Sequence, residues 1–220
     1  MIEDQSRASV MHKTKVVLAS GNKGKIRELQ HQLGDRFELI SQSELDVAAP
    51  EETGLTFLEN ALIKARAAAK QTGLPAIADD SGLAVDYLNG APGIYSARYS
   101  GSEATDEKNN AKLLQELEGV AEEKRKAYFH CALVFMQHHL DPTPIISQAS
   151  WHGRILIKPS GTRGFGYDPL FYVFDQKCAS AELSAETKNK VSHRGQAIDA
   201  LIRQINKNLA HNKSLTGREI

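Results

Sequence analysis

The sequence predicts an α/β protein with a mixed β-sheet. In the first third of the chain, short apolar runs that end in turn residues alternate with segments of helical periodicity, as in interleaved strands and helices. In the middle, β-rich runs at 128–136 and 145–157 follow each other without a helix between them, which indicates antiparallel neighbours. The 220 residues, 41% of them hydrophobic, suffice for one domain, or for one core with two lobes.

The N-terminal half alternates between expected strands and helices. Apolar runs predict the strands, and a period near 3.6 residues predicts the helices. The expected elements are a strand at 14–19, a helix at 24–34, a strand at 37–40, a loop at 41–54 and a helix at 56–72. The last helix is the best defined, because Thr56 and Glu59 form a capping box at its start.

The C-terminal half is richer in expected strands. Short strand pieces flank the acidic pair at 79–80, and a helix is expected at 105–118, with Ala111, Leu114 and Leu117 turned inward. The remaining expected elements are a strand at 128–136, two paired strands at 145–151 and 153–157 around Gly153, a strand at 170–174 and an amphipathic helix at 194–209.

The charge balance limits the kind of partner. The chain carries 27 basic and 27 acidic residues, so its formal net charge is zero. This argues against duplex DNA or an anionic membrane, because both attract a strongly basic surface. A small anionic ligand needs only a local cluster of cations. We therefore expect a small-molecule substrate, with neither a nucleic acid nor a membrane as partner.

Nothing in the sequence predicts export or membrane insertion. No apolar run approaches the ~18 residues of a membrane span, and the first residues, MIEDQSRASVMHK, lack the apolar stretch of a secretory signal. Cys131 and Cys178 are expected to be free thiols in a reducing compartment. We expect a cytoplasmic protein with a flexible extension at 1–12, one domain at 13–210 and a flexible tail at 211–220.

The stretch SGNKGK at 20–25 lies between the first expected strand and the first expected helix. Free amides at a helix N-terminus favour an anion, and Lys23 and Lys25 add positive charge. The stretch matches neither the Walker A pattern nor G-x-G-x-x-G. From spacing alone, phosphate binding and an ordinary strand-to-helix turn are equally good interpretations.

The stretch ADDSGL at 78–83 places two adjacent carboxylates after an apolar run. Since successive strand side chains point to opposite faces, Asp79 and Asp80 cannot both face one ligand if the strand continues through them. Carboxylate oxygens near phosphates suit Mg²⁺, and the pair Glu51 and Glu52 could add a further ligand. A solvated Asp-Asp-Ser-Gly turn is the alternative.

Two further stretches lie nearer the C-terminus. GTRGFGYDP at 161–169 surrounds Phe165 and Tyr167 with glycines and could present an aromatic face to a flat heterocycle, although a glycine-rich hairpin is the more frequent outcome. ETKNKVSHRG at 186–195 gathers cations before the last helix, where they oppose the helix dipole and a bound anion would relieve them. A solvated helix start is the alternative there.

Taken together, these stretches resemble the inosine/xanthosine triphosphate pyrophosphatases. The order and spacing of that family are matched, from about Lys15 to the last helix, by the blocks SGNKGKIREL, EETGLTFLENALIKA, ADDSGLAVDYLNGAPGIYSARYSG, FGYDPLF and SHRGQA. Their joint occurrence is far more specific than any one of them. The resemblance implies an elongated single α/β domain with a twisted mixed β-sheet flanked by helices, two lobes around a central active-site cleft, and a homodimer.

The resemblance also implies roles for individual residues. Asp80 would be the catalytic proton acceptor and a Mg²⁺ ligand, with Glu51 preferred to Glu52 as second ligand and Asp79 as a further candidate. Ser81 would touch the substrate. The triphosphate would be bound by Ser20, Gly21, Asn22, Lys23, Gly24, Lys25 and Lys64. The base pocket would be lined by Phe165, Gly166, Tyr167, Asp168, Lys188, His193 and Arg194.

The implied reaction is hydrolysis of ITP, dITP and XTP to the monophosphate and pyrophosphate, by Mg²⁺-assisted attack of water on the α-phosphorus. Arg194 or His193 would donate to the 6-oxo group that adenine lacks, and leaving such a buried donor unpaired costs about 1–3 kcal/mol. Two other interpretations stay open. One is a nucleotide- or RNA-binding module without turnover, supported by the cations at 188–194, and the other is a pyrophosphatase for other modified nucleotides.

Overall fold

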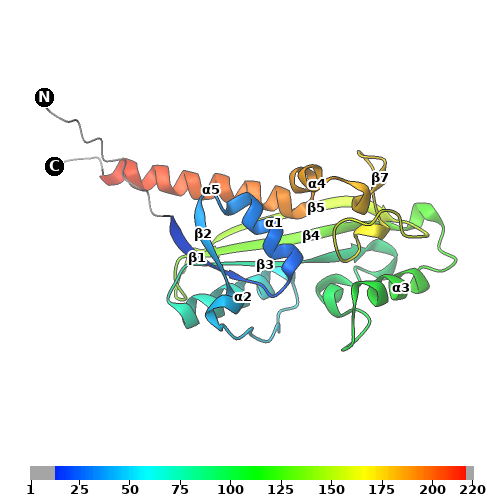
Figure 1. Ribbon diagram of the computed structural model, residues 1–220, viewed down its shortest axis with the longest axis horizontal. Helices are drawn as coiled ribbons and strands as arrows, with labels where there is room; N and C mark the ends of the chain where they lie inside the picture. Colours follow the sequence, from blue (N-terminus) through cyan, green and yellow to red (C-terminus); the bar gives the residue numbers. More distant parts are fainter. Residues whose placement is uncertain (1–12, 217–220) are drawn as a thin grey trace, which may run out of the picture.

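A seven-stranded mixed sheet extends along the length of the molecule (Figure 1). The structure, a computed structural model, describes residues 13–216, with side chains over 13–208. The strands are β1 (Thr14–Ala19), β2 (Phe37–Ser41), β3 (Ala76–Val85), β4 (Lys126–Met136), β5 (Ile145–Ile155), β6 (Phe171–Val173) and β7 (Cys178–Ala179). Their order is β2-β1-β3-β4-β5-β6-β7, with β1 parallel to β2 and β3 and the later pairs antiparallel. The predicted mixed sheet is confirmed.

Helices cover both faces of this sheet (Figure 1). They are α1 (Lys23–Leu33), α2 (Phe57–Thr72), α3 (Asp106–Glu116), α4 (Ala185–Val191) and α5 (His193–Thr216), with short 3₁₀ turns that include η3 (Gly93–Arg98). Apolar residues of α1 and α5 pack on one face, and the alanines of α2 pack on the other. A third cluster joins α3 to the far ends of β3, β4 and β5.

The alternation of side chains along β3 decides which helix each residue meets. Ile77 belongs to the cluster of α1 and α5, whereas Ala76 and Ala78 belong to that of α2. Continued by two residues, the same alternation turns Asp79 toward α1 and α5 and Asp80 toward α2. The two carboxylates therefore begin in different environments.

Several predicted elements are confirmed and two are corrected. The capping box of Thr56 and Glu59 starts α2 as expected. The strand pieces around the acidic pair are in fact one strand, β3, paired with β4 over its whole length, so the solvated turn is wrong. The two strands expected around Gly153 are likewise one strand, β5. Glycine is needed there because a Cβ would lie 2.3 Å from the Tyr172 carbonyl oxygen of β6.

The ends of the chain differ from the expectation in one respect. α5 begins at His193 and continues to Thr216 instead of ending at Leu209. The predicted extension at 1–12 and the last part of the predicted tail lie outside the described residues. Within the described part of the chain, no helix is both long and apolar enough to span a membrane.

Candidate active site

A pocket of about 370 Å³ lies between the part of the molecule built on β1, α1 and α2 and the part that carries α3. Its volume is in the usual range for small-molecule sites. The pocket corresponds to the predicted cleft between two lobes, and most of the predicted site residues line it. They are Ser20, Gly21, Asn22, Lys25, Lys64, Asp80, Ser81, Phe165, Gly166, Tyr167, Asp168, Lys188, His193 and Arg194.

The turn at 20–25 starts α1 with its own cap. The Asn22 Oδ1 atom accepts hydrogen bonds from the amides of Gly24 at 2.9 Å and Lys25 at 3.1 Å. Two amides that the sequence led us to expect free for an anion are therefore already bonded. Lys23 is exposed and lies outside the pocket lining. Gly24 is buried against Phe165, and a Cβ there would lie 2.6 Å from the ring.

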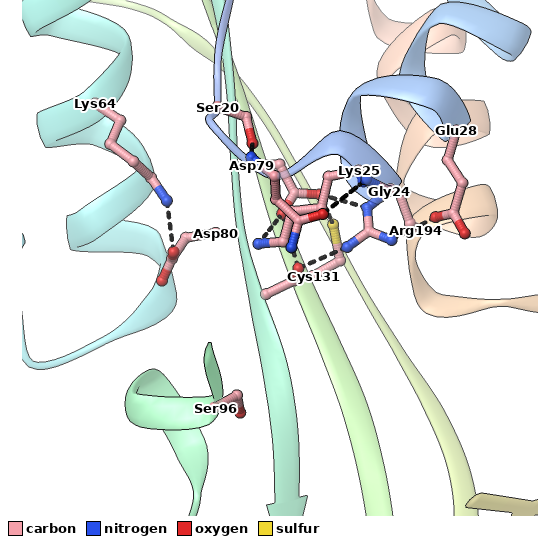
Figure 2. Close-up of polar contacts among 12 residues, drawn as sticks. Ser20, Gly24, Lys25, Glu28, Lys64, Asp79, Asp80, Ser96, Cys131 and Arg194 are labelled. Carbon is pink, nitrogen blue, oxygen red and sulfur yellow. Dashed lines mark hydrogen bonds and ion pairs between the residues drawn. The ribbon is translucent and has the colours of Figure 1, made fainter. Parts of the chain in front are cut away.

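Asp79 is fully buried in a network of cations and polar groups (Figure 2). One carboxylate oxygen lies 2.8 Å from Lys25 Nζ and accepts from the Ser81 hydroxyl at 2.7 Å. The other accepts from Arg194 Nε at 2.6 Å and from the Cys131 thiol at 3.3 Å. Although burial alone would raise it, Arg194 and Lys25 hold the pKa of Asp79 well below its usual value.

Asp80 faces α2 and the pocket. Its Oδ1 accepts from Lys64 Nζ at 2.6 Å, and the same ammonium group lies 3.1 Å from Glu52. Arg98 of η3 contacts the second oxygen of Glu52 at 3.0 Å. Burial raises the pKa of Asp80, even though Lys64 and Lys25 act in the opposite direction. Asp80 therefore holds a proton more readily than an ordinary aspartate does.

The adjacent carboxylates are tolerated because the strand separates them. Asp79 is neutralised by Lys25 and Arg194 on one face, and Asp80 is paired with Lys64 on the other. A Mg²⁺ ion against the pair would be one way to offset their repulsion. The structure instead gives each carboxylate its own cation within the chain.

The cations before α5 are also met by carboxylates of the chain. Lys188 Nζ lies 2.5 Å from Asp168 and 3.2 Å from Glu28, and it is 4.7 Å from the centre of the Phe165 ring. Arg194 is bonded to Glu28 as well as to Asp79. The expectation that these cations need a bound anion is therefore corrected, since buried carboxylates compensate them.

His193 begins α5 and is buried among aromatic rings. Its ring stacks on Phe129, with centroids 4.9 Å apart, and lies 6.4 Å from the Trp151 ring. Among the residues that the structure describes, none is a hydrogen-bond partner of its Nδ1 atom. Burial, with the positive charge of Arg194 next to it, holds the pKa of His193 well below its usual value, so the ring is neutral at neutral pH.

Of the two glutamates on the loop before α2, it is Glu52 and not Glu51 that lies at the pocket. Glu52 lines the pocket and shares Lys64 with Asp80, whereas Glu51 is exposed and lies outside the lining. The loop is fixed by α2, because Asn60 Oδ1 accepts from the Gly54 amide at 2.8 Å. Within the described residues, no group of three or more histidine, cysteine or acidic side chains is arranged to hold a metal ion.

Sequence reasoning missed some residues that shape the site. Glu28, on α1, bonds both Lys188 and Arg194, and thus joins the helix that follows the turn at 20–25 to the other end of the pocket. Its position three residues after Lys25 was a usable signal, because such residues share a helix face. Asp106 and Asn109 of α3 also line the pocket, and no pattern in the sequence singled them out.

The fold and the pocket define a class of protein. It is an α/β protein whose pocket pairs carboxylates with lysines at one end. At the other end it presents the segment 165–167, with the rings of Phe165 and Tyr167, which we call the aromatic wall. The chain belongs to the Ham1 family, whose family model matches residues 16–204.

Individual relatives agree with this assignment. The chain is 59% identical over 189 residues to a protein of Escherichia coli named dITP/XTP pyrophosphatase, covering 86% of this chain and 96% of that protein. A protein of the same name from Vibrio parahaemolyticus is 57% identical over 192 residues, covering 87% of this chain and 96% of that one. The solved structure of a HAM1 protein from Coxiella burnetii has a TM-score of 0.82 at 48% identity, covering 88% of this chain and 99% of that one.

Proposed function

We propose that this protein hydrolyses the non-standard purine nucleotides ITP, dITP and XTP to the monophosphate and pyrophosphate. The relatives named dITP/XTP pyrophosphatase support this substrate class. The observation that carries the proposal is the placement of Asp80. Its carboxylate has a raised pKa, lies 2.6 Å from Lys64, and shares one pocket with the aromatic wall of Phe165.

Asp80 is proposed to hold the attacking water and to accept its proton. Phosphoryl-type transfer requires mainly positioning and charge neutralisation from the protein. Lys64 and Lys25 line the same pocket and would offset the negative charge that develops on the leaving pyrophosphate. Ser20 and Asn22 would help to position the phosphates at the start of α1.

Asp80 and Glu52 are the residues proposed to hold Mg²⁺. They fit this ion because two carboxylates from different elements converge on one cation, the ammonium group of Lys64, and Mg²⁺ takes one or two protein carboxylates together with phosphates and water. When bound, the ion would acidify a water molecule and screen the phosphate oxygens. Asp79 is left out of this set, because its oxygens are bonded on the opposite face.

Base selection is assigned to Arg194 and His193. Both side chains line the pocket, and their positions are fixed by carboxylates and aromatic rings respectively. A donor beside the 6-oxo group of hypoxanthine or xanthine would be left unpaired by the 6-amino group of adenine. That loss costs about 1–3 kcal/mol, a preference of roughly tenfold to a hundredfold.

We further propose that the protein acts in the cytoplasm as a homodimer, on free nucleotides and not on nucleic acids or membranes. The zero net charge supports the choice of free nucleotides. Sedimentation of the purified protein at micromolar concentration tests the dimer, and a monomer would contradict it.

The function is tested with a panel of nucleoside triphosphates in the presence of Mg²⁺, measuring pyrophosphate and orthophosphate separately. ITP, dITP and XTP should release pyrophosphate, whereas ATP and GTP should release little. Chelation of the metal should stop the reaction. Binding of nucleotides without release of pyrophosphate from any of them would favour the binding module, and turnover confined to other modified nucleotides would favour the third interpretation.

A further inference from the structure

The first turns of α3 bind a single residue of the aromatic wall from both sides. The Gly166 amide donates to Asp106 Oδ2 at 2.6 Å, and Asn110 Nδ2 donates to the Gly166 carbonyl oxygen at 2.9 Å. Asn110 also donates to the Asp106 carbonyl oxygen at 2.8 Å. Gly166 lies between Phe165 and Tyr167, so these bonds fix the segment that carries both aromatic rings.

The same helix also binds η3, which lines the pocket beside the aromatic wall. Asn109 is buried, and its Nδ2 donates to the carbonyl oxygens of Ser96 at 3.3 Å and Ala97 at 3.2 Å. Its Oδ1 accepts from the Ser100 amide at 2.8 Å. η3 and the aromatic wall are also joined directly, since the Tyr167 hydroxyl donates to the Ser96 carbonyl oxygen at 2.8 Å.

These bonds differ in kind from those of the residues proposed for chemistry. Asp106 lines the pocket, but the described hydrogen bond of its carboxylate goes to backbone and not to Lys64 or Lys25. A hydrogen bond from an amide to a charged carboxylate is worth more than one between neutral groups. Asp106 is therefore the strongest single contact between α3 and the aromatic wall.

We propose that Asp106 is a positioning residue for base recognition, acting through Gly166 on the placement of Phe165 and Tyr167. This deepens the proposed function and rests on it. α3 thereby fixes the position of η3 relative to the aromatic wall, and both line the pocket that a purine base would enter. Asp106 would affect how tightly the base is bound, and it would have little effect on the chemical step at Asp80.

The test compares Asp106→Ala with Asp106→Asn. Alanine removes the acceptor for the Gly166 amide, whereas asparagine keeps a carbonyl oxygen at that position and loses only the charge. We expect Asp106→Ala to raise KM for ITP about tenfold, the order expected for one hydrogen bond to a charged group, with kcat within about twofold of wild type. Asp106→Asn should lie within about threefold of wild type in KM.

Glu107→Ala is the matched control. Glu107 lies in the same first turn and carries the same charge, and the described hydrogen bonds link it to nothing in the aromatic wall. It should leave KM and kcat unchanged, which separates the contact with Gly166 from a general effect of charge at the helix N-terminus. Inhibition by tripolyphosphate, which has no base, should be the same in all variants.

Several results would overturn the proposal. They are an unchanged KM in Asp106→Ala, a loss confined to kcat, an Asp106→Asn variant as impaired as alanine, or an equal loss of tripolyphosphate inhibition. If Asp106→Ala does not fold, Asn110→Ala takes its place, and it must also raise KM for ITP, by a smaller factor. If the wild type releases no pyrophosphate, the proposed function fails by itself, and ITP affinity measured by calorimetry then decides the role of Asp106.

Discussion

Asp79 and Asp80 are neighbours in the sequence and lie in opposite environments. Asp79 is buried among Lys25 and Arg194 and has a depressed pKa, whereas the pKa of Asp80 is raised in the pocket. Substitution of each by asparagine, which keeps the shape and removes the charge, should therefore separate stability from activity. Each variant is the control for the other.

Asp80→Asn should lose at least a hundredfold in kcat for ITP while it still binds the nucleotide, because the proton acceptor is gone. Its stability should be equal to or above that of wild type. The raised pKa means that the charged form is disfavoured in the folded state, so the neutral side chain relieves an unfavourable burial. Steady-state kinetics and urea unfolding measure the two effects, and wild-type turnover would refute the assignment of Asp80.

Asp79→Asn should destabilise the fold by about 3–5 kcal/mol, because two buried cations lose their compensating charge. The free energy of unfolding in urea measures this loss. A variant as stable as wild type would show that the network around Asp79 does not hold α1 and α5 on the sheet.

At this scale the sequence predicted that the two aspartates face opposite sides of the sheet, but not every partner. Alternation along a strand was enough to place the two aspartates on different faces. The choice between Glu51 and Glu52 depends on a loop without periodicity. That loop is fixed by the bond from Gly54 to Asn60, which no local pattern reveals.

Elements show where periodicity succeeds and where it fails. The capping box predicted the start of α2 correctly. Of the positions predicted to face inward along α3, Leu117 at its C-cap is buried and Leu114 is half-buried against the same cluster, but Ala111 is exposed. The buried residues within the helix are Asn109 and Leu113. A polar side chain was not expected inside, yet Asn109 is buried because backbone groups of η3 and of the following turn satisfy its amide.

His193, at the start of α5, should make the stability of the protein depend on pH. Because the folded state holds the pKa of His193 well below 6.5, the unfolded chain binds a proton below that pH that the native protein does not. Stability should thus fall as the pH drops from about 6.5 toward the lower folded pKa, by at most about 1.4 kcal/mol per pH unit from this residue.

His193→Phe should remove this part of the pH dependence, since phenylalanine can stack on Phe129 without titrating. Urea unfolding between pH 5 and 7.5 gives the slopes. His31→Phe, at an exposed position, is the control and should keep the wild-type slope. Parallel curves for wild type and His193→Phe would show that His193 is not protonated differently in the two states.

At the scale of the whole molecule, the order of the sheet assembles the site. β1 lies beside β3, which brings the turn at 20–25 next to Asp79 and Asp80. α5 packs on the same face of the sheet as α1 and adds Arg194 to the site (Figure 1). The mixed sheet could be predicted from the sequence because strands and helices alternate early and strands adjoin later. The bonds between α3 and the aromatic wall could not be predicted, because they join residues 56 and 60 positions apart.

The central claim is that water attacks the α-phosphorus in this pocket and pyrophosphate leaves. Hydrolysis of ITP by the wild-type protein in ¹⁸O-labelled water, with mass spectrometry of both products, tests it most directly. The label should appear in inosine monophosphate and be absent from pyrophosphate. Label in the pyrophosphate, or release of orthophosphate as the first product, would contradict the account.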